Sequence, residues 1–396
     1  MTGVDEEAMD ADLKSLGFRV EERRTLASGS DELLVNMGPQ HPSTHGVLRL
    51  LLRTDGEEVQ EAVPSVGYLH RAAEKIGENV TYDAYTPYTD RLDYLSSMNN
   101  NWAWAMTVEK LAGIEVPQRA EYIRVIVAEL NRIASHLVMV GTYGIDLGAF
   151  TPFLLTFRER EEILDILEEI SGGRLCYGYI RIGGVTDDIT PTFAAKCRAF
   201  LRQYVPKLDA INELLSYNRI FIRRTANVGP LSAERAVAYG CTGPTLRASG
   251  VDWDLRRDEP YSIYDRFDWN VCIGRGEKGT VGDTWDRYMV RVREMYECVK
   301  MCEQALEGIP EGPFRAKMPR KFKPPIGECY FRAENPRGEL AFYVVSDGSK
   351  KPVRVKVRAP SFCNLSAVQE LTRNMLVSDL VAVLGSFDLV MGEVDR

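Results

Sequence analysis

The stretch RAEYIRVIVAELNRIASHLVMV, residues 119–140, decides the fold class. Its apolar side chains recur at three- and four-residue spacings and share one stripe of a helix: Ile123, Ile126, Val127, Leu130, Ile133, Ala134, Leu137 and Val138. This is the strongest helix signal in the chain, and it predicts a mainly helical core.

Further helices follow from capping signals and periodicity. One is predicted from Thr151 as N-cap, with Pro152 in the first turn, to Gly172-Gly173. Another begins at Thr190-Pro191, and Pro206 is expected to kink or end it. A fourth helix runs from about Trp285 to Leu306. Residues 67–113 read as helical segments broken around Thr86-Pro87.

Two hairpins are predicted, one near each end of the chain. Residues 47–53 and 57–63 flank an Asp-Gly turn at Asp55-Gly56. In GELAFYVVSDGSKKPVRVKVRAP (338–360), Asp347-Gly348 forms the second turn, and strict alternation over Val353–Arg358 gives one apolar and one basic face.

The predicted fold class is therefore α+β, mainly α, with a helical core and small antiparallel β elements near both termini. Four regions are expected along the chain: an acidic N-terminal arm over 1–32 that clasps a partner, a β-hairpin region over 33–66, a helical core over 67–310, and a C-terminal hairpin and terminal segment over 311–396 that completes the core.

Composition excludes several classes of protein. A formal charge of -8 argues against nucleic-acid binding, which needs a basic face. Residues 1–30 lack an apolar core of signal-peptide length, so the eight cysteines, none in a CxxC pair, are expected to be reduced and mostly buried. Only four histidines are present, which weakens zinc or haem proposals. The apolar stretch 137–157 is interrupted by Asp146 and Pro152, so no membrane span is expected there.

Ionisable and aromatic groups lie beside Gly or Pro in four segments: GPQHPSTHGVLRL (38–50), GYLHRAAEK (67–75), DRLDY (90–94) and GIDLGAFTPF (144–153). Loops on a rigid scaffold often carry function. His45 and Tyr94 can each donate a hydrogen bond and then a proton to a carbonyl oxygen, and Asp146 can orient the imidazole.

Each of these residues also has a purely structural interpretation. His45 alone could equally be a satisfied core histidine, and Tyr94 a buried aromatic with one hydrogen bond. Asp146 could cap the turn between two helices. Arg71 and Arg91 could be surface ion-pair partners. Spacing alone leaves these alternatives open.

Nine motifs that follow one another along the chain favour the functional interpretation of these residues. GPQHPSTHGVLRL, LHRAAEK, DRLDY, DLGAFTPF, YIRIGGV, LRASG, RGELAFYVVSDG, VRAPSF and the terminal MGEVDR resemble the 49-kDa/NuoD-type subunit of respiratory complex I. The resemblance covers residues 33–396. This family is similar to the large subunits of [NiFe] hydrogenases, which implies a hydrogenase-like helical core.

The resemblance implies a quinone-binding subunit of proton-translocating NADH:quinone oxidoreductase, active only within the multisubunit complex. His45 and Tyr94 would hydrogen-bond the quinone headgroup, and Asp146 would pair with His45. Arg71, Arg91 and Cys176 would lie near the terminal [4Fe-4S] cluster, which the NuoB-type partner ligates. The chain would hold no cofactor of its own, with quinone as substrate. Further partners would be NuoC-type, ferredoxin-like NuoI-type and membrane NuoH-type subunits, on the cytoplasmic side of the inner membrane.

The sequence departs from related patterns in two ways. The hydrogenase CxxC pairs map onto Asp93 and Ser96, and onto Val390 and Glu393, so no thiolate remains to hold nickel and iron. Cys176 stands where family members carry a histidine before the YIR motif. In addition, EGIPEGPFRAKMPRKFKPPIGECY (307–330) directly bridges an interval that in many members holds a His- and Phe-rich helical insert.

Three rival functions remain open from the sequence. The same site could take electrons from reduced ferredoxin or F420H2, which the neighbouring electron-donor genes would decide. A hydrogenase-like enzyme is disfavoured by the missing CxxC pairs. A non-catalytic scaffold is disfavoured by the intact set of His45, Tyr94 and Asp146.

Overall fold

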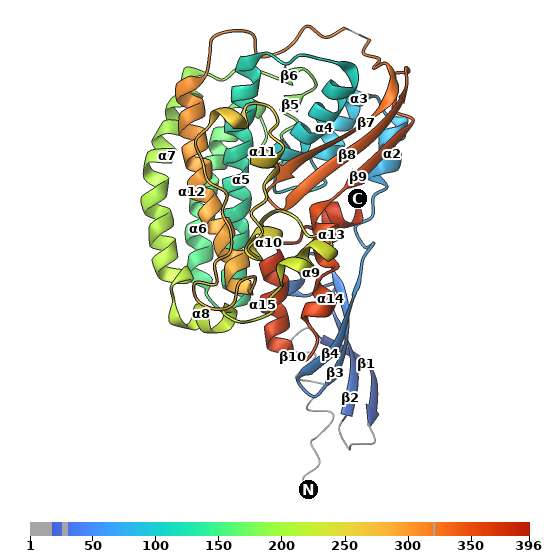
Figure 1. Cartoon of the computed structure of the whole chain (residues 1–396), viewed down its shortest axis with the longest axis vertical. Helices are drawn as coiled ribbons and strands as arrows, with labels where there is room; N and C mark the ends of the chain where they lie inside the picture. The colour runs from blue at the N-terminus through green and yellow to red at the C-terminus, as the bar shows by residue number, and fades with distance from the viewer. Residues whose placement is uncertain (1–17, 26–30, 320) are drawn as a thin grey trace.

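A bundle of long helices lies beside a twisted three-stranded sheet, and a second sheet extends from one end (Figure 1). The structure is a computed structural model that describes residues 18–25 and 31–396 apart from residue 320. The fold is α+β and mainly α, as the sequence predicted, with the two larger antiparallel sheets formed near the two ends of the chain.

The helix at the centre of the bundle is α5, Gln118–Asp146, and it contains the predicted stretch. It packs against α6 (Phe150–Ser171) and α12 (Thr284–Gly308), and α7 (Pro191–Ile211) packs on α6. The predicted helices are therefore confirmed. Side chains of α5 are buried on nearly all sides because neighbours cover the helix around its circumference.

One local prediction about these helices is wrong, and a second, that Pro206 kinks or ends its helix, is wrong as to the ending. The N-cap of α6 is Ala149, whose amide donates to Gly144 O at 2.7 Å, so Thr151 already lies inside the helix. Pro206 lies inside α7 and does not end it, because Tyr204, Leu208 and Ile211 stay buried in the core on both sides of the proline. The cap at Thr190 is confirmed: its side chain accepts from Phe193 N at 2.9 Å.

The break predicted at Thr86-Pro87 is also wrong. Helix α3 (Tyr82–Thr89) runs through Pro87, and the chain turns instead between α2 (Ala73–Asn79) and α3, and between α3 and α4 (Ser97–Ala112). The buried rings of Tyr82 and Tyr85 contact Trp104 of α4, and this packing keeps the last turn helical despite the proline.

The N-terminal sheet has the order β1-β2-β3-β4-β10. It confirms the first predicted hairpin, with β3 (Arg49–Asp55) and β4 (Glu58–Ser65) paired antiparallel. Strand β1 (Phe18–Thr25) falls within the predicted arm but pairs with β2 (Asp31–Met37). The rest of the predicted arm, residues 1–17 and 26–30, lies outside the described residues. Strand β10 (Met375–Leu376) closes the other edge.

The second sheet consists of β7 (Ile326–Asn335), β8 (Gly338–Asp347) and β9 (Arg354–Arg358). It confirms the hairpin at Asp347-Gly348. Strand β7 was not predicted; it begins near the end of the 307–330 bridge. The apolar face of β9 packs on α2, where Val355 lies against Gly77, and the exposed Arg354 and Lys356 pair with Glu78 and Glu74.

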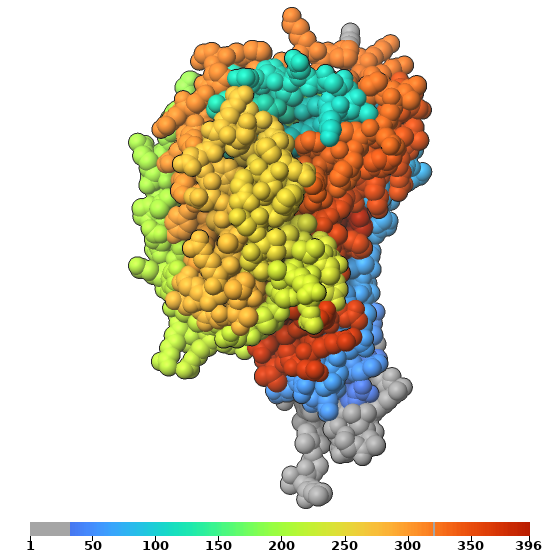
Figure 2. All heavy atoms as spheres, viewed as in Figure 1, coloured from blue at the N-terminus to red at the C-terminus, as the bar shows by residue number. Residues whose placement is uncertain are grey.

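Short elements complete the chain: β5 (Ile180–Arg181), β6 (Gly184–Val185), α8 (Arg219–Thr225), α9 (Ala233–Ala238), α10 (Gly243–Ala248), α11 (Leu255–Asp258), α13 (Pro360–Leu365), α14 (Val368–Leu371), α15 (Val377–Phe387) and α16 (Met391–Asp395). The segment from α9 to α12, yellow to orange, covers one face of the bundle (Figure 2). None of the helices among the described residues is both long and apolar enough for a membrane crossing.

Buried apolar side chains of the described residues form two clusters. The larger cluster fills the bundle and the space beneath β7–β9 and includes Leu92. The smaller one lies beneath the N-terminal sheet and includes Met391 of α16. The C-terminus therefore ends inside the molecule, between β9 and α13 (Figure 1).

Candidate functional site

His45 and Asp146 form a short ion pair at the end of the central helix. His45 Nε2 lies 2.6 Å from Asp146 Oδ2, with the two side chains 21% and 6% exposed. Asp146 is the last residue of α5, and His45 follows the turn Pro42–Thr44 with a φ of 49°, a left-handed conformation that a non-glycine residue rarely adopts. The fold therefore brings together two residues predicted from loops about a hundred positions apart.

Charges around His45 favour its protonated form. Burial lowers the pKa of the imidazole, but the hydrogen bond and the charge of Asp146, with the charge of Asp388, outweigh it, so that the pKa is raised above 6.5. His45 therefore carries a proton more readily than a free histidine, as a proton donor requires.

Tyr94 lies in the turn between α3 and α4 and is half-buried. Its ring lies against Gly392 of α16, where an added Cβ would come within 3.3 Å of Tyr94 Cδ1. Burial raises the pKa of the phenol, with the charges of Asp93 and Asp388 adding to it. The hydroxyl is therefore neutral and can donate a hydrogen bond. Asp388 and Arg337 act on both His45 and Tyr94, which places the two donors around the same buried charges.

Arg337 is the centre of that buried network. Its guanidinium donates to Asp93 Oδ2 at 2.7 Å, to Ser135 Oγ at 2.8 Å and to Asp388 Oδ1 at 2.9 Å. Its Nε donates to the carbonyl of Asp388 at 2.9 Å. The charge-assisted bonds fix the α3–α4 turn to the β7–β8 turn and to the end of α15.

The positions that map onto the hydrogenase cysteines also lie together. Ser96 Oγ donates to Asp93, Ser361 N donates to Glu393 Oε1 at 2.9 Å, and Val390 N donates to Ser361 Oγ at 3.3 Å. Burial, with the charge of Asp93, raises the pKa of Glu393 to about 8. Hydroxyl and carboxyl groups around Arg337 now occupy this place. Over residues 32–396, apart from residue 320, no cluster of His, Cys, Asp and Glu has the arrangement of a metal site.

Arg71, Arg91 and Cys176 form a second group. Arg71 donates to the carbonyl of Arg91, and Arg91 donates to the carbonyl of Pro87 at 2.5 Å. Both arginines are exposed, and Cys176 is half-buried. Burial, with the charge of Asp90, raises the pKa of the Cys176 thiol, while Arg91 and Arg71 lower it. The three residues predicted to face a partner's cluster are thus neighbours.

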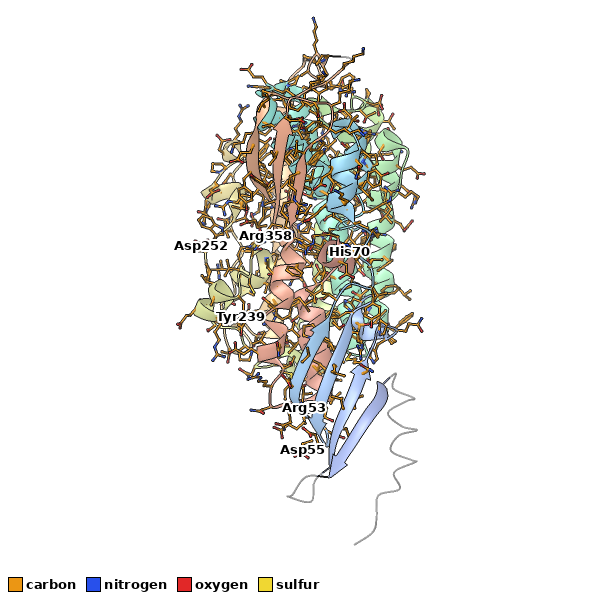
Figure 3. All side chains as sticks on the ribbon, turned by 90° about the vertical axis from the view of Figure 1, so that its right-hand side faces the viewer. Arg53, Asp55, His70, Tyr239, Asp252 and Arg358 are labelled. Carbon is orange, nitrogen blue, oxygen red and sulfur yellow. The ribbon has the colours of Figure 1, made fainter. Side chains whose placement is uncertain are left out.

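The segment GYLHRAAEK holds the C-terminus in place. Gly67 N and Leu69 N donate to the carboxylate of Asp395 at 2.8 and 2.7 Å, and His70 Nδ1 lies 2.6 Å from the carbonyl of Asp395. His70 lies near the middle of the molecule, far from Arg53 and Asp55 on the N-terminal sheet (Figure 3). Its role is therefore to anchor α16.

The sequence alone assigned no role to Arg337 or Asp388. Arg337 is the first residue of the motif RGELAFYVVSDG, and Asp388 lies shortly before the motif MGEVDR. The available signal was a charged residue within an otherwise apolar segment: Asp388 follows the apolar helix α15, and Arg337 sits in a hairpin whose strands are largely buried.

Comparison with known proteins shows the family of the chain. The family model described as "Respiratory-chain NADH dehydrogenase, 49 Kd subunit" matches residues 146–325 and 317–396. The chain is 53% identical over 371 residues to an NADH-quinone oxidoreductase subunit of Chlorobium chlorochromatii, covering 93% of each chain. It is 54% identical over 371 residues, 93% of each chain, to the corresponding subunit of Chlorobaculum tepidum. It is 52% identical over 367 residues to that of Desulforamulus reducens, covering 92% of this chain and 99% of the relative. The chain belongs to the family of the 49 kDa subunit of respiratory-chain NADH dehydrogenase.

Proposed function

We propose that this chain forms, together with an iron–sulfur partner, the cavity in which an NADH:quinone oxidoreductase reduces quinone. The observation that carries the proposal is the convergence of the His45–Asp146 pair, in which the pKa of His45 is raised, and the Tyr94 hydroxyl, whose pKa is also raised, around Arg337 and Asp388. These are two proton donors beside a buried charge network, in a family whose named relatives are subunits of such an enzyme.

Quinone reduction needs two electrons and two protons for each molecule of quinol. His45 and Tyr94 each donate a hydrogen bond to a carbonyl oxygen of the quinone headgroup, either to one oxygen each or to the same oxygen one after the other. Each gives up one proton as the carbonyl oxygens gain negative charge. Asp146 holds the imidazole in place and stabilises its charged form. Binding and proton supply are the tasks of this chain, and electrons come from elsewhere.

The electron donor is a [4Fe-4S] cluster held by the NuoB-type partner. Arg71, Arg91 and Cys176 support this side of the cavity, because two exposed guanidinium groups held by backbone carbonyls suit an anionic cluster. NuoC-type, NuoI-type and NuoH-type subunits complete the surroundings, at the cytoplasmic face of the inner membrane. Changes of charge at the His45–Asp146 pair are then transmitted to the membrane arm that pumps protons.

The N-terminal half of α6 supports a partner contact beside the site. Phe150 and Leu154 are 60% and 55% exposed, shortly after Asp146 in the chain. Phe153 and Phe157 stack with ring centroids 4.1 Å apart, and Arg160 lies 5.8 Å from the Phe157 ring. Exposed aromatic and arginine side chains are enriched in protein interfaces. The second half of α6 is polar instead, and there Arg174 pairs with Glu161, Asp165 and Glu168.

The decisive experiment is Tyr94→Phe in the assembled complex. Only the hydroxyl is lost while the ring still packs on Gly392, so assembly is retained and quinone reduction falls by about 10²-fold or more. NADH oxidation by an artificial acceptor that takes electrons upstream stays normal. Tyr88→Phe, a 40% exposed tyrosine of α3, is the matched control and leaves both activities unchanged. Normal quinone turnover in Tyr94→Phe refutes the proposed site.

A further inference from the structure

A buried carboxyl group lies behind Tyr94 and has no role in the site described above. Glu393 of α16 is fully buried. Its Oε1 accepts from Ser361 N at 2.9 Å, whereas its Oε2, also buried, has no hydrogen-bond partner among the residues that the structure describes. A buried polar atom without a partner calls for an explanation.

The cations near Glu393 are already bonded to other groups: Arg71 donates to the carbonyls of Arg91 and Gly392, and Arg337 to other carboxylates. Arg337 donates to Asp93 and Asp388, and these two charges exceed its own. Arg291 lies 3.7 Å from Asp388 and balances that second carboxylate. Within the described part of the chain, Glu393 is thus an additional acid with no hydrogen-bonded cation.

The other described elements packed against Glu393 bring no cation to its carboxyl group either. Helix α13 faces it with the neutral Ser361. On α16 itself, Asp395 accepts from the backbone of residues 67 and 69, and Arg396 donates to Val357 O and lies over the ring of Phe362. The remaining charged neighbour is Asp93, a like charge.

These surroundings keep a proton on the carboxyl group. Burial and the charge of Asp93 raise the pKa of Glu393 to about 8, against the hydrogen bond from Ser361 and the charge of Arg337. Glu393 is therefore mostly neutral at pH 7, and a protonated carboxyl group is a proton donor.

Glu393 and Tyr94 belong to two segments in direct contact. A Cβ added at Gly392 would lie 2.6 Å from Leu92 O and 3.3 Å from Tyr94 Cδ1, so only glycine lets α16 approach the turn this closely. Asp93, the carboxylate that repels Glu393, immediately precedes Tyr94 in the chain and accepts a hydrogen bond from Ser96. The charge of Asp93 thus acts on both Glu393 and Tyr94.

We propose that Glu393 is the internal proton reserve of the site, which returns a proton by way of Asp93 to Tyr94 or His45 after quinone has been reduced. The proposal rests on the function proposed above and adds a residue to it. In each turnover Tyr94 and His45 give two protons to the quinone that has received two electrons from the partner's cluster. A phenolate and a neutral imidazole remain. Glu393 re-protonates one of them and becomes a carboxylate, and two protons from solvent then restore the other donor and Glu393.

The test is Glu393→Gln in the assembled complex, with quinone reduction measured from pH 6 to 9. Glutamine keeps the size, the neutrality and the hydrogen bond to Ser361 N, but it has no proton to release. In the wild type the rate falls as pH rises through about 8, because the reserve is then empty. In Glu393→Gln the rate falls about 10²-fold at pH 7 and this alkaline decline disappears. Glu393→Asp restores part of the rate.

Glu121→Gln serves as the matched control. Glu121 is a partly buried glutamate whose pKa is also raised by burial, but it lies at the start of α5, at the opposite end of that helix from Asp146. Its substitution leaves the rate and the pH profile unchanged.

A readout independent of turnover is the carbonyl stretch of a protonated carboxyl group in infrared difference spectra at pH 7. The band is present in the wild type and absent in Glu393→Gln. A second readout is stability. The Glu393 carboxyl group has a pKa of about 8 in the folded chain and its ordinary value of 4.5 in the unfolded chain. The free energy of unfolding of the wild type therefore falls as pH rises from about 4.5 to about 8. Over this pH range the melting temperature of the full-length Glu393→Gln chain falls less than that of the wild type.

The outcomes separate this proposal from the proposed function. The proton reserve is overturned by any one of three results for Glu393→Gln: a rate and pH profile like those of the wild type, a slow rate that keeps the alkaline decline, or an unchanged carbonyl band. If Tyr94→Phe is inactive and Glu393→Gln is normal, the quinone site stands and only the reserve fails. If Tyr94→Phe is normal, the quinone site itself fails.

Discussion

At the residue scale, the pair His45–Asp146 is expected to act as one unit. With 2.6 Å between Nε2 and Oδ2, removing either partner removes the function of the other. His45→Ala and Asp146→Ala should therefore be strongly non-additive, with an interaction energy of about 0.5–3 kcal/mol from quinone reductase rates in the singles and the double. In Asp146→Ala the pKa of His45 should drop, because the hydrogen bond and the negative charge that raise it are lost. The distant, exposed Lys196→Ala combined with His45→Ala should be additive. Additive losses for His45 and Asp146 would mean that the ion pair has no part in turnover.

At the scale of elements, caps and packing decide where helices begin and end. Thr190 caps α7 by accepting from Phe193 N, whereas Thr151 lies inside α6 and does not cap it. Thr190→Ala should lower the free energy of unfolding by about 1 kcal/mol, measured by denaturant titration of the chain. Thr151→Ala, at an exposed position with the same change of side chain, should cost less than half as much. Equal effects would show that the loss comes from the side chain and not from the cap.

Packing also decides, at the scale of elements, where a helix continues. Helix α3 continues through Pro87 because its aromatic residues are buried against α4.

At the scale of the whole molecule, Cys176 bears on the partner's cluster. A histidine at this place would take up a proton on reduction of the cluster, since added negative charge raises an imidazole pKa. The Cys176 thiol, with its pKa raised by burial, stays neutral in both redox states near pH 7. The cluster in the assembled complex should therefore have a potential nearly independent of pH. Cys176→His should introduce a slope of about 59 mV per pH unit in an EPR-monitored titration. A full slope already present in the wild type would assign the proton to another group.

Also at this scale, many buried charges hold the fold together without taking part in the site. Arg247 and Arg256 bind Glu294, Asp254 and Glu129 within the bundle, and His136 of α5 donates from Nε2 to Glu294 Oε2 at 2.8 Å. Burial lowers the pKa of His136, in contrast to His45. Two histidines with carboxylate partners thus differ because His136 is buried more completely and its neighbours include Arg291 and Arg132.

The sequence by itself determined the local elements and the family. Helical periodicity depends on spacing along the chain, so α5, α6, α7 and α12 could be predicted, as could the Asp-Gly hairpins, whose turns need particular residues. His45, Tyr94 and Asp146 could be named from motifs, but their contact could not.

Only the tertiary structure decided which side chains meet. Arg337, Asp388 and Glu393 come from the far end of the chain, and no local spacing indicates that they gather around His45 and Tyr94. Strand β7 and the continuation of α3 through Pro87 likewise depend on packing against α4, which outweighs local propensity. The pKa values of the site follow from burial and from charges distant in sequence, and these exist only once the chain has folded.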